Sequence, residues 1–579
     1  MRSDPTRTLR IASVVCAALV AAVPAGAAEP VISDFAIARP VVAAHGMVVS
    51  QEAVASRIGV EILKRGGNAV DAAVAVGFAL AVTLPRAGNI GGGGFMLIHR
   101  ADLGKTIAID YRESAPALTT RDVFLDDKGE AAPAKSLISG LGIGVPGTVA
   151  GLELAWRKYG SGRYTFADLV APAARLAHEG VAVDDDLADS LPVGAPRLAL
   201  HPASARIFLK PDGTPKTLGD RLPLDDLAAT LDAIAAEGAK GFYAGPVAEK
   251  MVAAIRAAGG RMSLDDLANY HAIEREVVRG TYRGHEIVSM PPPSSGGVHI
   301  VEILNILEAW PLGAQGLNSA ATIHEMAEAE KLAYADRAQY LGDPDFLHVP
   351  VKGLTSKAYA AHLREGISLD HARRAADIRP GGPEPYESDQ TTHFSIVDEQ
   401  GDAVANTYTL NLPYGSGLVA EGTGVLLNNE LDDFAAKPGA ANAFGLTGGD
   451  ANAPGPNKRP LSSMSPTMVF KDGKLEIVTG SPGGSRIITT VLQVILDIVD
   501  HGLNVAEAED APRVHDQWLP DELRIERGLS PDTIRLLEAM GHKVVVREAM
   551  GSANTIERRG GVWLGASDPR QRGTLAVGY

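Results

Sequence analysis

The chain has 579 residues, of which 45% are hydrophobic and 21% are charged, and its formal net charge is −16. This is ordinary composition for a soluble globular protein, and the length allows a large core. The acidic balance and the lack of a long basic run argue against a nucleic-acid partner.

Residues 1–27 have the pattern of a signal peptide. Three arginines precede an apolar run from Ile11 to Val23, and Ala25-Gly26-Ala27 is a small-x-small cleavage site. The run is too short for a permanent membrane anchor, so we expect an exported protein, periplasmic or secreted. The only cysteine, Cys16, lies in this segment, which excludes disulfides and a cysteine nucleophile from the mature chain.

Two helices are expected next, over Gln51–Arg65 and Asn68–Thr83, separated by two glycines. The second is apolar almost all round but carries Asp71 and has only 16 residues. This pattern predicts a helix buried against a sheet and not a membrane span.

Gly88–Gly94 is glycine-rich but leads into a predicted strand, whereas a dinucleotide-binding loop opens a helix. We therefore expect a tight backbone crossing here. A further strand, Thr106–Arg112, ends in an arginine that either binds a ligand carboxylate or lies on the surface.

The middle of the chain is mainly helical. Helices are predicted over Val149–Tyr159 and Phe166–Glu179, and most of 224–270 is helical as well. A helix over His324–Asp336 begins with His-Glu, but Glu328 stands where a zinc-protease motif needs its second histidine. We interpret this helix as having a charged face.

A hairpin is predicted from 391–397 to 403–410, with Gln400-Gly401 as a two-residue turn and Glu399 facing Asp402. Thr391 then lies opposite Leu410, to within one residue. The arrangement is either a threonine-rich hairpin or a set of polar groups around a nucleophilic threonine.

Three later segments suit a ligand that resembles an amino acid. Residues 428–433 hold three acids, which suit an ammonium or a calcium ion, although the calcium-loop spacing is absent. Residues 461–465 offer adjacent hydroxyls for a carboxylate. A strand over 474–479, glycines at 480–485 and a helix over 486–499 form either an oxyanion hole or a simple turn.

QTTHFSIVD, NNELDDF, KRPLSSMSPT, GSPGGSRI and the terminal GASDPR resemble the γ-glutamyltransferase (glutathione hydrolase) family. The similarity extends over nearly the whole mature chain. It implies an α+β protein of the N-terminal nucleophile hydrolase type, with a four-layer αββα sandwich. A precursor would cleave itself between Gln390 and Thr391, giving a large subunit, 28–390, and a small catalytic subunit, 391–579.

The resemblance also implies roles for single residues. Thr391 is the nucleophile of self-cleavage and of turnover, Thr409 orients it, and Gly483 and Gly484 bind the oxyanion. The remaining implied residues contact the substrate: Arg112, Ser462 and Ser463 bind its α-carboxylate, and Asn411, Glu430 and Asp433 bind its α-ammonium.

Residues 438–449 resemble a lid loop whose tip carries Tyr in many members of the family and Phe444 here. A phenyl ring cannot donate a hydrogen bond to Asn411, so we expect a more loosely closed lid.

The resemblance implies attack on the γ-glutamyl amide of glutathione and related compounds, giving an ester that passes to water or to an amino acid or dipeptide. No metal or organic cofactor is implied. Two alternatives stay open. One is a glutaryl-type (cephalosporin) acylase of the same superfamily, whose substrate has no α-ammonium. The other is a non-catalytic, exported amino-acid binding protein, which would remain a single chain.

Overall fold

The computed structural model describes residue 32 and residues 36–383 and 393–579. The predicted signal peptide, residues 1–27, and the predicted junction Gln390–Thr391 lie outside the described residues. The described part combines many helices with two large antiparallel sheets, which confirms the predicted α+β class.

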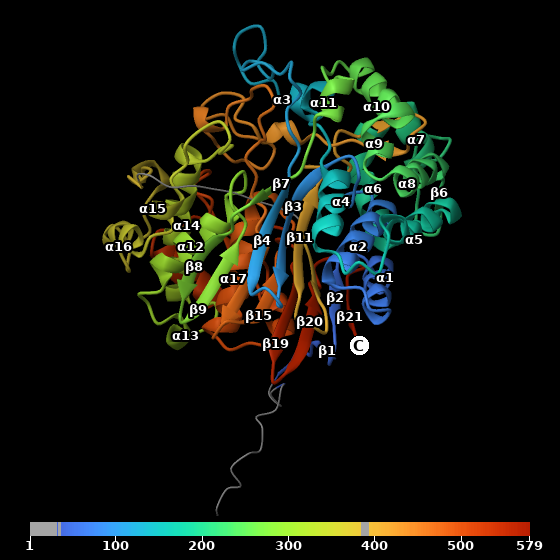
Figure 1. Cartoon of the computed structure of the whole chain (residues 1–579). Helices are drawn as coiled ribbons and strands as arrows, with labels where there is room; N and C mark the ends of the chain where they lie inside the picture. Colours follow the sequence, from blue (N-terminus) through green and yellow to red (C-terminus); the bar gives the residue numbers. More distant parts are fainter. Residues whose placement is uncertain (1–31, 33–35, 384–392) are drawn as a thin grey trace, which may run out of the picture.

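Each of the two sheets has seven strands (Figure 1). The first sheet is ordered β21 (Leu575–Gly578), β2 (Met47–Ser50), β10 (Phe394–Val397), β11 (Ala403–Thr409), β3 (Gly93–Arg100), β4 (Lys105–Tyr111), β7 (Ile273–Arg275). The second is ordered β1 (Val41–Ala43), β20 (Val562–Ser567), β19 (Asn554–Arg559), β15 (Lys474–Thr479), β14 (Thr467–Lys471), β9 (His285–Ser289), β8 (Val278–Tyr282). Both sheets therefore contain strands from either side of residue 390.

The sheets pack face to face through alternate side chains. One buried cluster joins inward residues of both sheets, among them Val49, Leu97, Ala405, Met468, Val478 and Ile556. The neighbouring residues on the strands point the other way and pack against helices, as Val48, Ile98 and Val404 do in the first sheet.

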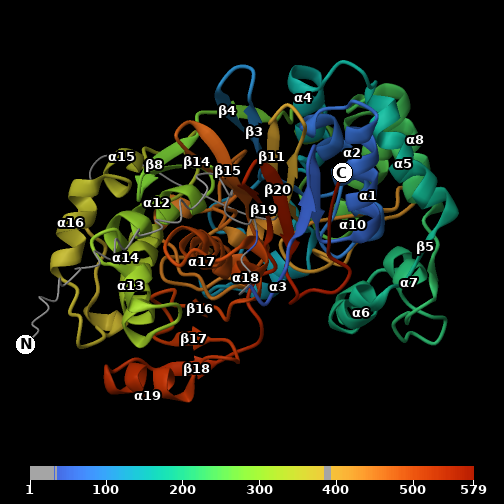
Figure 2. The same ribbon diagram turned by 90° about the horizontal axis from the view of Figure 1, so that it is seen from below.

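Helices cover the outer face of each sheet (Figure 2). Those over the first sheet include α1 (Ala53–Lys64), α2 (Ala69–Thr83), α4 (Thr148–Tyr159), α5 (Phe166–Glu179) and α8 (Asp225–Glu237). Those over the second include α12 (Gly296–Leu307), α14 (Ala320–Tyr340) and α17 (Ile487–Val499). The order of layers is thus helices, sheet, sheet, helices.

The remaining helices and strands lie outside the two large sheets and the helices named above. The helices are α3 (Pro133–Leu137), α6 (Asp185–Leu198), α7 (Pro202–Phe208), α9 (Lys240–Tyr243), α10 (Gly245–Ala257), α11 (Leu264–Ala268), α13 (Leu312–Gln315), α15 (Val351–Leu354), α16 (Lys357–Glu365), α18 (Val505–Asp510) and α19 (Pro531–Ala539). The strands are β5 (Val181–Ala182), β6 (Arg221–Leu222), β12 (Val419–Ala420), β13 (Val425–Leu426), β16 (Val514–His515), β17 (Leu523–Ile525) and β18 (Val544–Val546).

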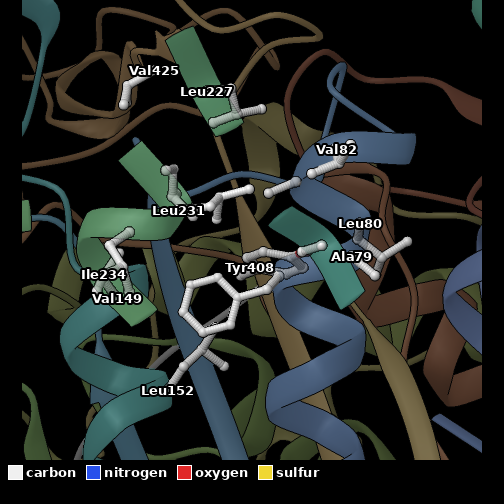
Figure 3. Packing of buried hydrophobic residues seen from close by; sticks show 14 of the residues in the cluster. Ala79, Leu80, Val82, Val149, Leu152, Leu227, Leu231, Ile234, Tyr408 and Val425 are labelled. Carbon is white, nitrogen blue, oxygen red and sulfur yellow. The ribbon is translucent and has the colours of Figure 1, made fainter. Parts of the chain in front are cut away.

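Helix α2 is buried along its whole length, as expected. Asn68 caps it, since its side chain accepts from the Asp71 N–H at 3.0 Å and the Asp71 carboxylate accepts from the Asn68 N–H at 3.1 Å. Figure 3 shows Leu80 of this helix, Leu152 of α4 and Tyr408 of β11, which belong to one buried cluster. No helix among the described residues is long and apolar enough to cross a membrane.

The glycine loop before β3 is a backbone crossing, as predicted. A Cβ on Gly91 would lie 2.2 Å from the Leu426 carbonyl oxygen, and one on Gly92 would lie 2.0 Å from that of Thr409. Asn89 also donates to the Thr409 carbonyl at 2.9 Å. The loop therefore supports the end of β11, and only glycine permits so close an approach.

The predicted hairpin forms, but its turn and register were wrong by one residue. Val397 pairs with Ala403, and the Asp398 N–H donates to the Asp402 carbonyl at 3.1 Å. The turn therefore has three residues, and its last, Gly401, has a φ of 87°. A left-handed glycine in third place is typical of three-residue hairpin loops.

The charged face predicted for residues 324–336 was also wrong. Helix α14 is buried almost throughout, and several of its charged side chains have partners in the interior. Glu328 accepts from Lys331 Nζ at 2.9 Å and from Arg373 Nε at 2.8 Å. Helix α14 lies in the layer over the second sheet, so its charged residues are covered by neighbouring segments.

A buried carboxyl group on α17 predicts a pH-dependent stability. Burial raises the pKa of Asp497 to about 8, although Arg513 and Arg570 act to lower it. An unfolded aspartate has a pKa of about 3.9, so between about pH 4 and pH 8 the folded chain binds the extra proton, and the free energy of unfolding falls as pH rises. Asp497→Asn removes this contribution. Its thermal midpoint should fall less between pH 5 and pH 8 than that of the wild type, by a few degrees; parallel profiles would contradict the assignment.

Candidate active site

A cavity of about 300 Å³ collects most of the residues that the sequence singled out. Its wall includes Thr409, Asn411, Glu430, Asp433, Ser463, Gly483, Gly484 and Phe444. Arg112 and Ser462 do not line it; both are buried behind the wall. Gln390 and Thr391, predicted to complete the site, lie outside the described residues.

The described chain resumes at His393, immediately before β10. Its ring lies 3.1 Å from Thr407 Oγ1 and 2.6 Å from Ser395 Oγ. A Cβ on Gly480 would lie 2.3 Å from His393 Nδ1, so the start of β10 adjoins the loop that carries Gly483 and Gly484. Burial lowers the pKa of His393 to about 3, and the imidazole is neutral at ordinary pH.

Arg112 lies at the centre of a buried acidic cluster. Its guanidinium donates to Glu430 through Nη1 and to Asp433 Oδ2 through Nη2, the latter at 2.7 Å. Glu113 Oε2 is 3.9 Å from Arg112 Nη1. Burial tends to lower the pKa of Arg112, but the three carboxylates raise it above its ordinary value.

The cluster holds more acid than its arginine can neutralise. Burial raises the pKa of Glu430 well above its ordinary range and that of Glu113 to about 7, although Arg112 acts to lower both. Burial raises the pKa of Asp433 as well. Glu430 Oε2 is buried without a hydrogen-bond partner among the described residues. A ligand cation at this end of the cavity would offset the excess negative charge.

The adjacent serines differ in exposure to the cavity. Ser463 lines it, and its hydroxyl is buried without a hydrogen-bond partner among the described residues. The Ser462 carbonyl accepts from the Ser295 N–H at 3.1 Å and from its hydroxyl at 3.0 Å. Ser463 is therefore the one placed to meet a ligand directly.

The second glycine loop, which joins β15 to the short helix η5 (Gly484–Arg486), has the backbone of an anion site. Gly483 has a φ of 141° and Gly484 a φ of 59°, and residues other than glycine rarely adopt such positive φ values. No described residue accepts a hydrogen bond from the Gly483 N–H. The loop thus presents backbone at the cavity wall.

The segment 438–449 folds over the glycine loop. A Cβ on Gly484 would lie 2.3 Å from Phe444 Cδ1. Asn442 Nδ2 donates to Asp433 Oδ1 at 2.9 Å, and the Ala443 N–H donates to Asp432 Oδ2 at 3.0 Å. The segment is therefore tied to the acidic cluster through Asn442, which the sequence analysis did not identify.

Three residues could in principle hold a metal. One ligand atom from each of His324, Glu328 and His542 lies within 4.8 Å of the others. His324 Nδ1 is 2.8 Å from His542 Nε2, so these rings already share a hydrogen bond. Two cationic side chains, Lys331 and Arg373, already pair with Glu328 and offset its charge.

Comparison with known proteins agrees with this geometry. The family model "Gamma-glutamyltranspeptidase" matches residues 55–578. The "Glutathione hydrolase proenzyme" of Escherichia coli (strain K12) is 57% identical over 542 residues, which cover 93% of each chain. A cephalosporin acylase from Bacillus halodurans superposes with a TM-score of 0.83 at 27% identity, covering 95% of this chain and 99% of that one. Gamma-glutamyltranspeptidase from Helicobacter pylori gives a TM-score of 0.57 at 44% identity, covering 58% and 95%.

Proposed function

The chain belongs to the gamma-glutamyltranspeptidase family, and from that premise we propose that it is a self-processing glutathione hydrolase that also transfers the γ-glutamyl group. In this proposal, residues 1–27 are removed as a signal peptide and the enzyme acts in the periplasm or outside the cell. Self-cleavage leaves subunits 28–390 and 391–579, which together form an N-terminal nucleophile hydrolase fold with four αββα layers.

Thr391 is the proposed nucleophile. Its hydroxyl attacks the γ-carbonyl carbon of glutathione while its own α-amine takes the proton. That proton passes to the leaving amine as the C–N bond to Cys-Gly breaks, and a γ-glutamyl-threonyl ester remains. Water or the amine of an amino acid or dipeptide then attacks the ester and releases Thr391.

Thr409 is the proposed orienting residue. Thr391 precedes Phe394 by three positions, and Thr409 follows Asn406, the partner of Phe394, by three positions. The Thr409 hydroxyl accepts from the Asn411 N–H at 2.8 Å and lies on the cavity wall, which fixes its direction.

Gly483 and Gly484 supply the proposed oxyanion hole. Their backbone lies on the cavity wall at the N-terminal side of α17, where N–H groups and the helix dipole favour negative charge. The nucleophile, its base and these donors are all groups of the protein, so the proposed mechanism needs no metal or organic cofactor.

The observation that carries the proposal is the excess of acid around Arg112. The α-ammonium of a γ-glutamyl group would pair with Glu430 and Asp433, with Asn411 beside them. Its α-carboxylate would meet Ser463 on the cavity wall. The resemblance also assigns Arg112 and Ser462 to this carboxylate; both lie behind the wall, and Arg112 would have to release Glu430 or Asp433 to reach it. A zwitterion thus places a positive group beside the acids and a negative group beside the hydroxyls. It would also give hydrogen-bond partners to Glu430 Oε2 and Ser463 Oγ, which have none among the described residues.

Acylation of the substrate amine tests this directly. We expect release of Cys-Gly from glutathione but at least about 100-fold lower kcat/KM with N-acetyl-glutathione, because the buried acids lose their cation. The two substrates share the same scissile bond. Equal rates would contradict the assignment of the acidic cluster to the α-ammonium.

The lid, 438–449, is proposed to close through Asn442, whereas many members of the family carry a tyrosine at the tip of this loop. Asn442→Ala removes the hydrogen bond to Asp433, so KM for glutathione should rise about 5- to 10-fold with a smaller change in kcat. Hydrogen exchange of the lid should speed up in parallel.

Phe444→Tyr is the companion variant for the lid. If the hydroxyl adds a bond to Asn411, exchange in the lid slows and KM falls. If Asn442→Ala leaves both exchange and KM unchanged, Asn442 does not hold the lid.

The glutaryl-type acylase is the nearest alternative. Its substrate would leave Glu430 and Asp433 without a cation, which the charge balance of the cavity disfavours. The non-catalytic binding protein is the third possibility, and it requires a chain that stays whole.

A further inference from the structure

The active-site cavity is also lined by residues whose chemistry is opposite to that of the acidic cluster. Arg486, Ser552 and Gln571 all line the cavity, and each offers hydrogen-bond donors. Ser552 and Gln571 lie outside the motifs quoted for the family resemblance, and Arg486 lies in GSPGGSRI but has no role in the proposed function.

Two of these donors are unused. Ser552 is 3% exposed, and its hydroxyl has no hydrogen-bond partner among the described residues. The Gln571 Nε2 amide is likewise buried, with no acceptor in the described part of the chain. Buried donors without partners cost free energy, and at a cavity wall they indicate a missing acceptor.

Arg486 is loosely held. Its Nε is 3.4 Å from the Gly483 carbonyl oxygen, and its Nη1 is 3.3 Å from Glu548 Oε1. The Glu548 side chain is 75% exposed, so this ion pair contributes little and exchanges readily for a ligand carboxylate. The bond to Gly483 places the guanidinium beside the proposed oxyanion loop.

We propose that Arg486, with Gln571 and Ser552, forms a subsite for the free carboxylate of the peptide half of the reaction. The inference rests on the proposed function. The amine that leaves and the amine that later attacks bond to the same carbonyl carbon, so both occupy the space beyond the oxyanion loop. An arginine beside two neutral donors binds a carboxylate well, because its planar fork matches the two oxygens.

The subsite therefore selects peptide amines that carry a free carboxylate. The cavity wall thus holds both acids, Glu430 and Asp433, and an arginine, Arg486, as a γ-glutamyl peptide with its ammonium and its terminal carboxylate requires. Amines in which the carboxylate is blocked should react through the same ester but bind more weakly.

The test compares two acceptors, glycylglycine and glycylglycinamide, which differ only in the carboxylate. In the wild type, kcat/KM for the acceptor should be about tenfold higher for glycylglycine. Arg486→Gln should lower the glycylglycine value to that of the amide and leave the amide value unchanged within about twofold. Gln571→Leu should lower the ratio of kcat/KM for glycylglycine to kcat/KM for glycylglycinamide, but by less than Arg486→Gln does. Arg535→Gln, at an exposed arginine paired with Asp532, is the matched control and should keep the full ratio.

Hydrolysis of the γ-glutamyl donor without acceptor is measured in every variant. If the wild type releases glutamate from the donor but does not distinguish the two acceptors, the subsite is overturned while the proposed function stands. If Arg486→Gln lowers kcat/KM equally for both acceptors, Arg486 acts on the glycine loop and not on the carboxylate. The subsite is then overturned as well. Failure of γ-glutamyl release in the wild type overturns the proposed function itself.

Discussion

Thr391→Ala should leave the chain whole and inactive. The wild type is expected to separate into a chain that ends at Gln390 and one of 189 residues that starts at Thr391 (579 − 390). Alanine has no hydroxyl to attack the preceding carbonyl, so neither the cut nor the later γ-glutamyl ester can form. Denaturing electrophoresis and intact mass spectrometry measure the cut, and glutathione turnover should drop by at least about 1,000-fold.

Thr392→Ala is the matched control, since it removes the adjacent hydroxyl. It should still be cut and should retain turnover within about tenfold. A Thr391→Ala protein that still separates at the same bond would contradict the assignment of the nucleophile. A wild type that stays whole and releases no glutamate from glutathione would favour the binding-protein alternative.

Asp433→Asn should have the second-largest effect. Asp433 accepts from Arg112 and from Asn442 and lines the cavity where the α-ammonium is proposed to bind. The amide keeps the shape but loses the charge, so kcat/KM for glutathione should fall about 100-fold. For a glutaryl amide, which lacks the ammonium, kcat/KM should fall far less.

Asp432→Asn is the control at the neighbouring position. Asp432 accepts from Ser136 and from the Ala443 N–H and does not line the cavity. Its replacement should change the ratio of kcat/KM for glutathione to kcat/KM for the glutaryl amide by no more than about threefold. Equal losses for glutathione and the glutaryl amide in Asp433→Asn would show that Asp433 acts only on the fold of the site.

Elements with strong local signals were predictable from the sequence. The bounds of α5 and β15 agree with the predicted Phe166–Glu179 and the strand over 474–479. Both have a regular apolar period and clear ends, such as the Thr165 cap before α5. The motif residues around 411, 430, 463 and 483 also meet at one cavity, because they lie on segments that end near it.

Features that depend on distant partners were not predictable in this way. The sequence of α14 has the charge pattern of a surface helix. In the fold, however, Glu328 pairs with Arg373 and Lys331 pairs with Asp516, and both partners lie far along the chain. The hairpin register depends on the conformation of Gly401, which the dipeptide alone leaves open. Arg486, Ser552 and Gln571 come from three segments without a shared motif, and only the fold brings them together.

The most direct test of the central claim is rapid-quench intact mass spectrometry during turnover of glutathione. The chain that begins at Thr391 should gain the mass of one γ-glutamyl group, lose it when glycylglycine is added, and yield a modified Thr391 on fragmentation. An adduct on any other residue, or turnover with no adduct under conditions where the ester should accumulate, would contradict the account.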